Sequence, residues 1–240
     1  MRNINMMNQN EIIRLLTDKN CVMHISQMTG DQLAASFGEE FRILQGYDQN
    51  NPHHHLDLLN HTLAVVSGIY DQQLPYEDAI CLALSALLHD IGKPTVVKFK
   101  ADRSVYYDHP LASRQIADDL LHAYGFADGQ IHRILFFIGY HDAFINFKLP
   151  DEIVPCSNPH LKPITHSSVT KQLQHIQFES EHEYRYSPTI NDFQLLMKLC
   201  AADAAAQSET VYQSGRIIDT RRNKLERIHS IDVIIGSFHA

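Results

Sequence analysis

The sequence predicts an all-α protein, and three features support that prediction. Apolar residues recur at helical spacing along most of the chain, and residues 80–88 are apolar on every face of a helix. Only residues 96–107 show a pattern typical of strands. Hydrophobic residues make up 44% and charged residues 20% of the 240 residues, which is the balance of a globular protein with a sizeable core.

Helical periodicity begins near the N-terminus. Residues 9–17 are predicted to form a short amphipathic helix, and residues 31–45 a second one with Asp31 as its N-cap. The turn-rich residues 46–54 then lead into a helix over residues 55–70.

The most informative predicted helix covers residues 77–90. Its second half is apolar on all sides, so a helix here must be buried. Gly92 and Pro94 end it, as is usual just past a helix C-terminus. The pair His89-Asp90 is therefore expected at the end of a central, buried helix.

The following elements are shorter or more polar. Residues 96–107 are predicted as one small β-hairpin, and Pro110 in a first turn predicts a helix from residue 109 to about 124. Further helices are expected over residues 127–142, 167–178, 189–206 and 219–235.

We expect one domain over residues 1–240, because no repeat or low-complexity tract divides the chain. It is expected to comprise an N-terminal helical extension (1–51), a core (52–142 plus 189–209), an irregular excursion (143–188) and a C-terminal helix (210–240).

Composition also bears on location and partners. A net charge of −8 argues against a general nucleic-acid binder, and the basic run at residues 221–227 is interpreted as a solvated helix face. The four cysteines fit neither a disulfide framework nor a zinc ribbon, so free thiols in a reducing compartment are expected. With no signal peptide and no segment of roughly 20 apolar residues, the expected location is the cytoplasm, with no membrane partner.

Two acidic residues are predicted to lie in apolar surroundings. Asp203 shares a helix face with Leu196, Leu199 and Cys200, and Asp90 ends the buried helix. A buried carboxylate is costly unless something pairs with it, and a bound cation would satisfy both.

Four histidines are predicted at inward or terminal helix positions, namely His61, His89, His109 and His141. Facing helices of a bundle can hold metal ligands rigidly, and nitrogen and oxygen donors without a thiolate suit Mn, Fe, Co, Ni or Zn. Structural alternatives stay open, because His109 could cap its helix and His141 could hydrogen-bond in the core. The neighbouring residues His53, His54 and His55 are interpreted as a solvated helix start.

The order His61, His89-Asp90, Asp203 resembles the H…HD…D signature of the HD phosphohydrolase superfamily. Between residues 52 and 142 the segments NPHHHLDLLNHTLAVV, ALLHDIGKP, YYDHPLASRQIADDLL and IGYHDAF resemble the HD domain attached to bacterial CCA-adding tRNA nucleotidyltransferases. The nucleotidyl-transfer motif of those enzymes does not precede this block, so the resemblance implies a free-standing hydrolase with an HD-type helical bundle.

The resemblance also implies residue roles. His61, His89, Asp90 and Asp203 would be the primary metal ligands, and His109 and His141 would bind a second metal. Lys93 falls at a lysine that can face substrate phosphate. The implied cofactor is a pair of divalent transition-metal ions (Fe, Mn, Ni, Co or Zn, with Mg as an alternative). The GYP motif of the cyclic-dinucleotide branch is replaced here by GYHD.

The expected reaction is hydrolysis of a phosphoester or phosphoanhydride of a nucleotide-like small molecule by metal-activated water. Asp90 would orient the water and Lys93 would stabilise phosphoryl charge, while Asp57 and Asp142 are candidates for fixing histidine tautomers. Two alternatives stay open: an RNA-associated or regulatory module without turnover, and a mononuclear nucleotidase that uses only His61, His89, Asp90 and Asp203.

Overall fold

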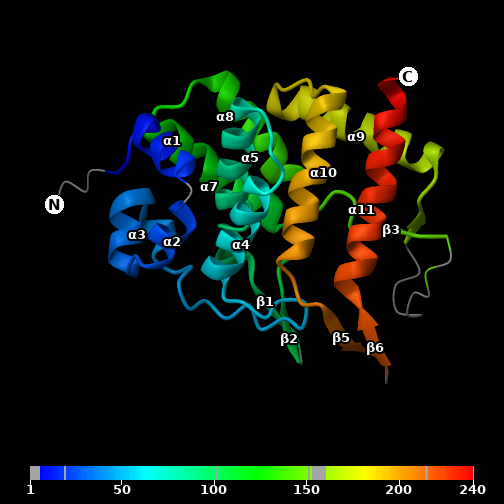
Figure 1. Cartoon of the computed structure of the whole chain (residues 1–240), viewed down its shortest axis with the longest axis horizontal. Helices are drawn as coiled ribbons and strands as arrows, with labels where there is room; N and C mark the ends of the chain where they lie inside the picture. The colour runs from blue at the N-terminus through cyan, green and yellow to red at the C-terminus, as the bar shows by residue number, and fades with distance from the viewer. Residues whose placement is uncertain are drawn as a thin grey trace.

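The computed structural model describes residues 6–18, 20–100, 102–150, 152, 161–213 and 216–239. Helices dominate these ranges, and the strands form only two-stranded pairs (Figure 1). The predicted all-α class is therefore confirmed. Cys21, Cys81 and Cys200 are free thiols, whereas Cys156 lies outside the described residues.

Three short helices form the N-terminal part, drawn in blue in Figure 1: α1 (Gln9–Thr17), α2 (Cys21–Ser26) and α3 (Gly30–Phe37). α1 has its predicted bounds, whereas α2 was not predicted. The helix expected over 31–45 is shorter, because Gly38 adopts a φ of 120° that favours glycine and ends it before the 3-10 turn η1 (Glu39–Phe41). Asp31 is not the N-cap; the Thr29 hydroxyl accepts from the Gln32 backbone N–H in a capping box.

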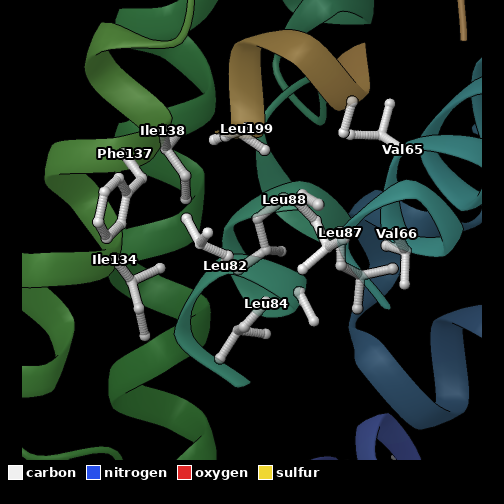
Figure 2. Close-up of a cluster of buried hydrophobic side chains, with 14 of the residues drawn as sticks. Val65, Val66, Leu82, Leu84, Leu87, Leu88, Ile134, Phe137, Ile138 and Leu199 are labelled. Atoms are coloured by element: carbon white, nitrogen blue, oxygen red, sulfur yellow. The ribbon is translucent and has the colours of Figure 1, made fainter. Parts of the chain in front are cut away.

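The core is built from α4 (Leu58–Tyr70), α5 (Tyr76–Leu88), α8 (Asp128–Tyr140) and α10 (Ile190–Ala205). α5 lies between α4 and α8, and α10 packs along α4. Figure 2 shows side chains of α5 meeting those of its three neighbours. The labelled residues are Leu82, Leu84, Leu87 and Leu88 of α5, Val65 and Val66 of α4, Ile134, Phe137 and Ile138 of α8, and Leu199 of α10.

The segment Tyr76–Val96 is apolar and long enough to cross a membrane, contrary to the expectation that no segment would reach that length. Of its most apolar window, 78% is buried inside the protein. Burial by α4, α8 and α10 accounts for the apolar composition, so this segment is the core helix of a bundle with no clear membrane signal.

An ion network joins the N-terminal halves of α5, α8 and α10. The Arg133 guanidinium donates to Asp78 Oδ1 at 2.7 Å and to Asp192 Oδ1 at 2.9 Å. The other oxygen of Asp192 accepts from the backbone N–H and the hydroxyl of Thr189, at 2.9 and 2.7 Å. This network holds the three helices in fixed register.

Two glycines allow neighbouring helices to pack closely, one between α6 (Lys93–Val96) and α7 (His109–Tyr124) and one between α4 and α10. After α5, the short helix α6 packs on α7. A Cβ at Gly92 would collide with the backbone of Ser113 and lie 2.6 Å from the carbonyl carbon of Ala112, so only glycine fits there. Gly68 of α4 similarly faces Ala202, since an added Cβ would lie 3.1 Å from the Ala202 methyl group.

The predicted hairpin is present as β1 (Lys98–Lys100) and β2 (Arg103–Val105) in antiparallel pairing. A second antiparallel hairpin, β5 (Thr210–Gln213) and β6 (Arg216–Asp219), was not predicted and precedes the final helix α11 (Thr220–Gly236) and the turn η2 (Ser237–His239). Both hairpins lie in the lower part of Figure 1. Residues of both hairpins line one groove.

The excursion over residues 143–188 is more regular than predicted. It contains a short parallel pairing of β3 (Phe147–Lys148) with β4 (Lys162–Pro163), followed by α9 (His166–Tyr184). α9 is 19 residues long and extends beyond the predicted 167–178, because its buried side chains continue to Ser180. α11 then packs along α10 and α9.

Candidate metal centre

Six predicted ligands lie together in the interior, although five separate helices supply them. None is more than 8% exposed. They are His61 in the first turn of α4, His89 and Asp90 at the end of α5, His109 at the start of α7, His141 at the end of α8 and Asp203 in the last turn of α10.

The first group of donors surrounds one carboxylate oxygen of each aspartate. His61 Nε2 lies 3.0 Å from Asp203 Oδ1 and 3.4 Å from Asp90 Oδ2. His89 Nε2 lies 3.2 Å from Asp90 Oδ2 and 3.8 Å from Asp203 Oδ1. The ligand atoms of His61, His89 and Asp203 fall within 4.8 Å of one another, which is close enough for one cation to contact them all.

A second group of donors faces the other oxygen of Asp90. His109 Nε2 lies 3.1 Å from His141 Nε2, 3.2 Å from Asp90 Oδ1 and 3.5 Å from Asp142 Oδ2. Asp90 thus presents Oδ2 to the first group and Oδ1 to the second. His109, His141 and Asp142 form a further set of donors with metal-like spacing.

Asp142 was expected to fix a histidine tautomer, but its carboxylate lies among the donor atoms instead. The sequence held a signal for this position, because His141-Asp142 repeats the His89-Asp90 dyad at the end of another apolar helix. Asp57 does not fix a tautomer either. It caps α4 by accepting from the Asn60 backbone N–H at 2.8 Å.

Backbone carbonyl groups take the role expected of those two aspartates. The Nδ1 atom of His89 lies 2.7 Å from the Ala86 carbonyl oxygen, and that of His141 lies 2.7 Å from Ile138. His109 Nδ1 is likewise 2.8 Å from the Tyr106 carbonyl oxygen. With Nδ1–H donating to a carbonyl oxygen in each case, Nε2 is the ring nitrogen that points into the centre and that would bind a metal once its proton is lost.

The donor atoms lack partners of their own. Among the described residues, His61 Nε2, His89 Nε2 and both Asp90 oxygens are buried without a hydrogen-bond partner. Such atoms carry a desolvation cost that a cation would remove. The C-terminal ends of α5, α8 and α10 add partial negative charge at the same place. These residues therefore fit a divalent cation.

Attraction between the buried carboxylates and the basic side chains beside them shifts their pKa values. Burial alone would raise the pKa of Asp90, yet His89 and Lys93 hold it well below its ordinary value. Burial alone would lower the pKa of His89, yet Asp90 and Asp203 raise it to about 10. The cluster thus binds positive charge strongly, as protons or as metal.

The nearest thiol does not join the donors. Cys200 Sγ lies 3.0 Å from the His141 carbonyl oxygen and donates to it, and burial raises the pKa of this thiol well above its usual value. A protonated thiol is a poor ligand, so the donor set is nitrogen and oxygen only, which suits Mn, Fe, Co, Ni or Zn.

Lys93 lies beside the donors and is buried. Its ammonium group forms an ion pair with Asp90 Oδ2 at 2.6 Å and donates to Gln49 Oε1 at 2.9 Å. Gln49 was not predicted. Its position is fixed by Tyr106, whose hydroxyl donates to the Gln49 carbonyl oxygen at 2.6 Å.

An open cleft of about 670 Å³ leads from the surface to Asp90, Lys93 and Asp203. His53 and His54 line its wall, so only the exposed His55 matches the expected solvated helix start. Burial lowers the pKa of His53 to about 4 and that of His54 to about 2, which leaves both rings neutral.

Residues after α10 complete the wall of the cleft. Gln207 donates from Nε2 to Asp203 Oδ2 at 3.0 Å, and the Arg221 guanidinium donates to the Gln207 carbonyl oxygen at 2.6 Å. Lys224 donates to Gln207 Oε1 and lines the cleft. The basic run at 221–227 is thus not simply a solvated face; Arg222 alone of its cations is largely exposed. Gln207 was not predicted, because nothing in the local sequence marks it.

The bundle and its buried histidines and aspartates are similar to those of all-α proteins that hold a metal between facing helices. The family model of the HD domain matches residues 58–166, and this match supports membership of the HD superfamily. An HD domain suggests metal-dependent phosphohydrolase activity, and the buried clusters could hold the metal. The matched range includes five of the six predicted ligands and ends before Asp203.

A search of curated proteins found no significant match. The resemblance to the HD domain of CCA-adding enzymes stays a prediction.

Proposed function

We propose that this chain is a phosphohydrolase that holds two divalent cations and cleaves a phosphoester or phosphoanhydride of a nucleotide-like small molecule. One observation carries the proposal: Asp90 offers one carboxylate oxygen to His61 and His89 and the other to His109. A carboxylate that faces two sets of imidazoles could serve as a ligand in both halves of a two-metal site.

The first ion would be held by His61, His89, Asp90 and Asp203, and the second by Asp90, His109, His141 and Asp142. Bound cations of this kind lower the pKa of water to near neutral and offset charge on a phosphoryl group. The carboxylate of Asp90, which faces both sets of imidazoles, would keep the two sets of ligands in register and orient the attacking water.

Lys93 would bind the substrate itself. Its ammonium group lies at the wall of the cleft, where it would donate to a non-bridging phosphoryl oxygen and stabilise the charge that builds there. Lys93 pairs with Asp90 in the metal-free protein, and cations that took up the charge of Asp90 would release the ammonium group toward phosphate.

The size of the cleft supports a small substrate. A volume of about 670 Å³ lies within the range of roughly 300–1,000 Å³ that is usual for small-molecule sites. The three described free thiols support a reducing compartment such as the cytoplasm.

Metal analysis combined with turnover tests the proposal. We expect two equivalents of Mn or Ni in the wild-type protein, and hydrolysis of a chromogenic phosphomonoester or phosphodiester that Asp90→Asn abolishes. Asp118→Asn is the matched control, because this largely exposed carboxylate pairs with His122 at the surface and is not one of the donor residues.

Two outcomes would contradict it. Metal binding without hydrolysis of any compound in a broad nucleotide panel would favour a regulatory module. One equivalent of metal, unchanged in His109→Ala and His141→Ala, would favour a mononuclear nucleotidase.

A further inference from the structure

Lys224 reaches the cleft from α11, a helix outside the matched HD region. The cleft is lined by Lys224 together with Asp142, Asp203 and Lys93. A smaller cavity of about 70 Å³ is also lined by Lys224, Asp142 and Asp203. The lysine side chain therefore lines both cavities that border the candidate metal ligands.

The partners of Lys224 distinguish it from its neighbours. Arg227 pairs with Glu152, and Arg222 lies near Asp219 and Glu226. No carboxylate of the described residues lies within 4.0 Å of the Lys224 ammonium group, whose hydrogen bond goes to the neutral Gln207 amide. Burial lowers the pKa of Lys224, and Asp203 and Asp142 oppose that effect only from a distance.

A partly desolvated cation beside a neutral acceptor gains from a nearby anion. In the apo protein the charge of Asp203 and Asp142 provides part of that compensation. Divalent cations held by the same carboxylates would remove it. Lys93 and Lys224 would then both stand at the cleft without a free acidic partner.

We propose that Lys224 is a substrate-binding residue that contacts the terminal phosphate of the substrate, in the cleft that Lys93 also lines. This inference rests on the proposed phosphohydrolase function and narrows its substrate class. An ammonium group gains more from a dianion than from a monoanion. The enzyme should therefore prefer phosphomonoesters and phosphoanhydrides with a dianionic terminal phosphate over phosphodiesters.

Binding of inorganic phosphate by the Mn-loaded protein tests the role of Lys224, measured by isothermal titration calorimetry at pH 8. We expect Lys224→Gln to weaken phosphate binding at least about tenfold, the scale of one charge-assisted hydrogen bond. Lys224→Arg should stay within about threefold of the wild type, because it keeps the charge. Arg222→Gln is the matched control on the same helix and should leave phosphate binding unchanged.

Dimethyl phosphate, a monoanion, is the second probe, and its binding should change less than that of phosphate in Lys224→Gln. Mn affinity, measured separately, should be unchanged in this variant.

The inference is overturned if Lys224→Gln binds phosphate as well as Arg222→Gln does. It is also overturned if the variant loses Mn affinity instead, since Lys224 would then only position Gln207 against Asp203. A wild-type protein that binds no metal would contradict the proposed function itself, which is a different result.

Discussion

Buried acidic residues lie at both ends of α5, α8 and α10, but the groups that surround them differ between the two ends. Near their N-termini these helices bring together Asp78, Arg133 and Asp192, and at their C-termini His89-Asp90, His141-Asp142 and Asp203. Eleven residues separate Asp78 from His89, or about 16 Å along a helix. The same three parallel helices therefore carry buried acids at both ends.

At the N-terminal end, donors from the chain satisfy the buried acid. Asp192 accepts from Arg133 and twice from Thr189. At the C-terminal end, Asp90 faces imidazole Nε2 atoms and pairs with the Lys93 ammonium group, and its oxygens have no hydrogen-bond partner among the described residues. A buried carboxylate that accepts several hydrogen bonds from the chain is a structural element, whereas one held by ion pairs among metal-type ligands is a candidate cation site.

The sharpest test of this contrast replaces Asp90. We expect Asp90→Ala to abolish metal binding and to lower turnover by about 10³-fold or more, the scale of lost electrostatic stabilisation at a reacting centre. Helical content by circular dichroism should persist, because the apolar packing of α5 is untouched. Wild-type turnover in this variant would refute the role of Asp90.

A substitution in the network at the N-terminal ends of these helices should lower the free energy of unfolding without changing metal binding. Arg133→Gln leaves Asp192 without its cation, and we expect a loss of about 3 kcal/mol in the free energy of unfolding. Urea denaturation measures this loss. Arg222→Gln is the control. Because Arg222 is exposed, its replacement should change the free energy of unfolding by no more than about 0.5 kcal/mol.

Metal content of Arg133→Gln should stay at the wild-type value in the folded state. If it falls together with stability, the two ends do not behave independently.

Gly92 tests whether packing alone sets the geometry of the centre. A methyl group there must push α6 away from the backbone of α7, and so move Asp90 relative to His109. We expect Gly92→Ala to weaken metal affinity by about 10- to 100-fold, as changes around a ligand shell do.

Gly129→Ala is the matched control, because an added Cβ on this α8 glycine meets no atom within 4 Å. It should leave metal affinity unchanged and raise stability by up to about 1 kcal/mol. Equal metal affinities in the two variants would show that close packing at Gly92 does not position the ligands.

The pH should have a smaller effect on the stability of the metal-free protein. In the metal-free protein, carboxylates outweigh burial and raise the pKa values of His61, His89 and His109 above 6.5. Their stabilisation is therefore fully present below pH 6.5 and is lost as the pH rises through the raised values. We expect lower urea stability at pH 9 than at pH 6.5, and a smaller difference in Asp203→Asn.

The N-terminal network should respond in the acid range. Burial opposes ionisation of Asp192, but Thr189 and Arg133 hold its pKa below 3.8. Its contribution is present above pH 3.8 and is lost as the pH falls through the folded-state value. Arg133→Gln should therefore keep the decline between pH 6.5 and 9 while losing part of the acid dependence; an altered alkaline decline would break the comparison.

Much of this architecture follows from local sequence. Periodicity predicted α1, α5, α7 and α10 closely, because their apolar faces are strongly patterned. α3 is shorter than predicted for a local reason, since the Thr29 capping box and Gly38 set its ends. The hairpin at 210–219 was missed because its strands are short and its Tyr212 and Ile217 side chains are exposed.

The ligands of the candidate centre could be predicted where an ionisable side chain falls on an apolar helix face. His61, His89, Asp90 and Asp203 were found because charged or imidazole groups appear on apolar helix faces. Gln207 and Lys224 were missed because they are ordinary polar residues whose roles arise only when α11 folds back on α10. Tertiary contact, rather than local pattern, selects them.

Asp203 comes from α10, long after the segment that supplies the other ligands. On a nascent chain the second group of donors, Asp90, His109, His141 and Asp142, could therefore assemble before α10 emerges. The first group stays incomplete until Asp203 has been made, so the two halves of the centre become available at different stages of synthesis.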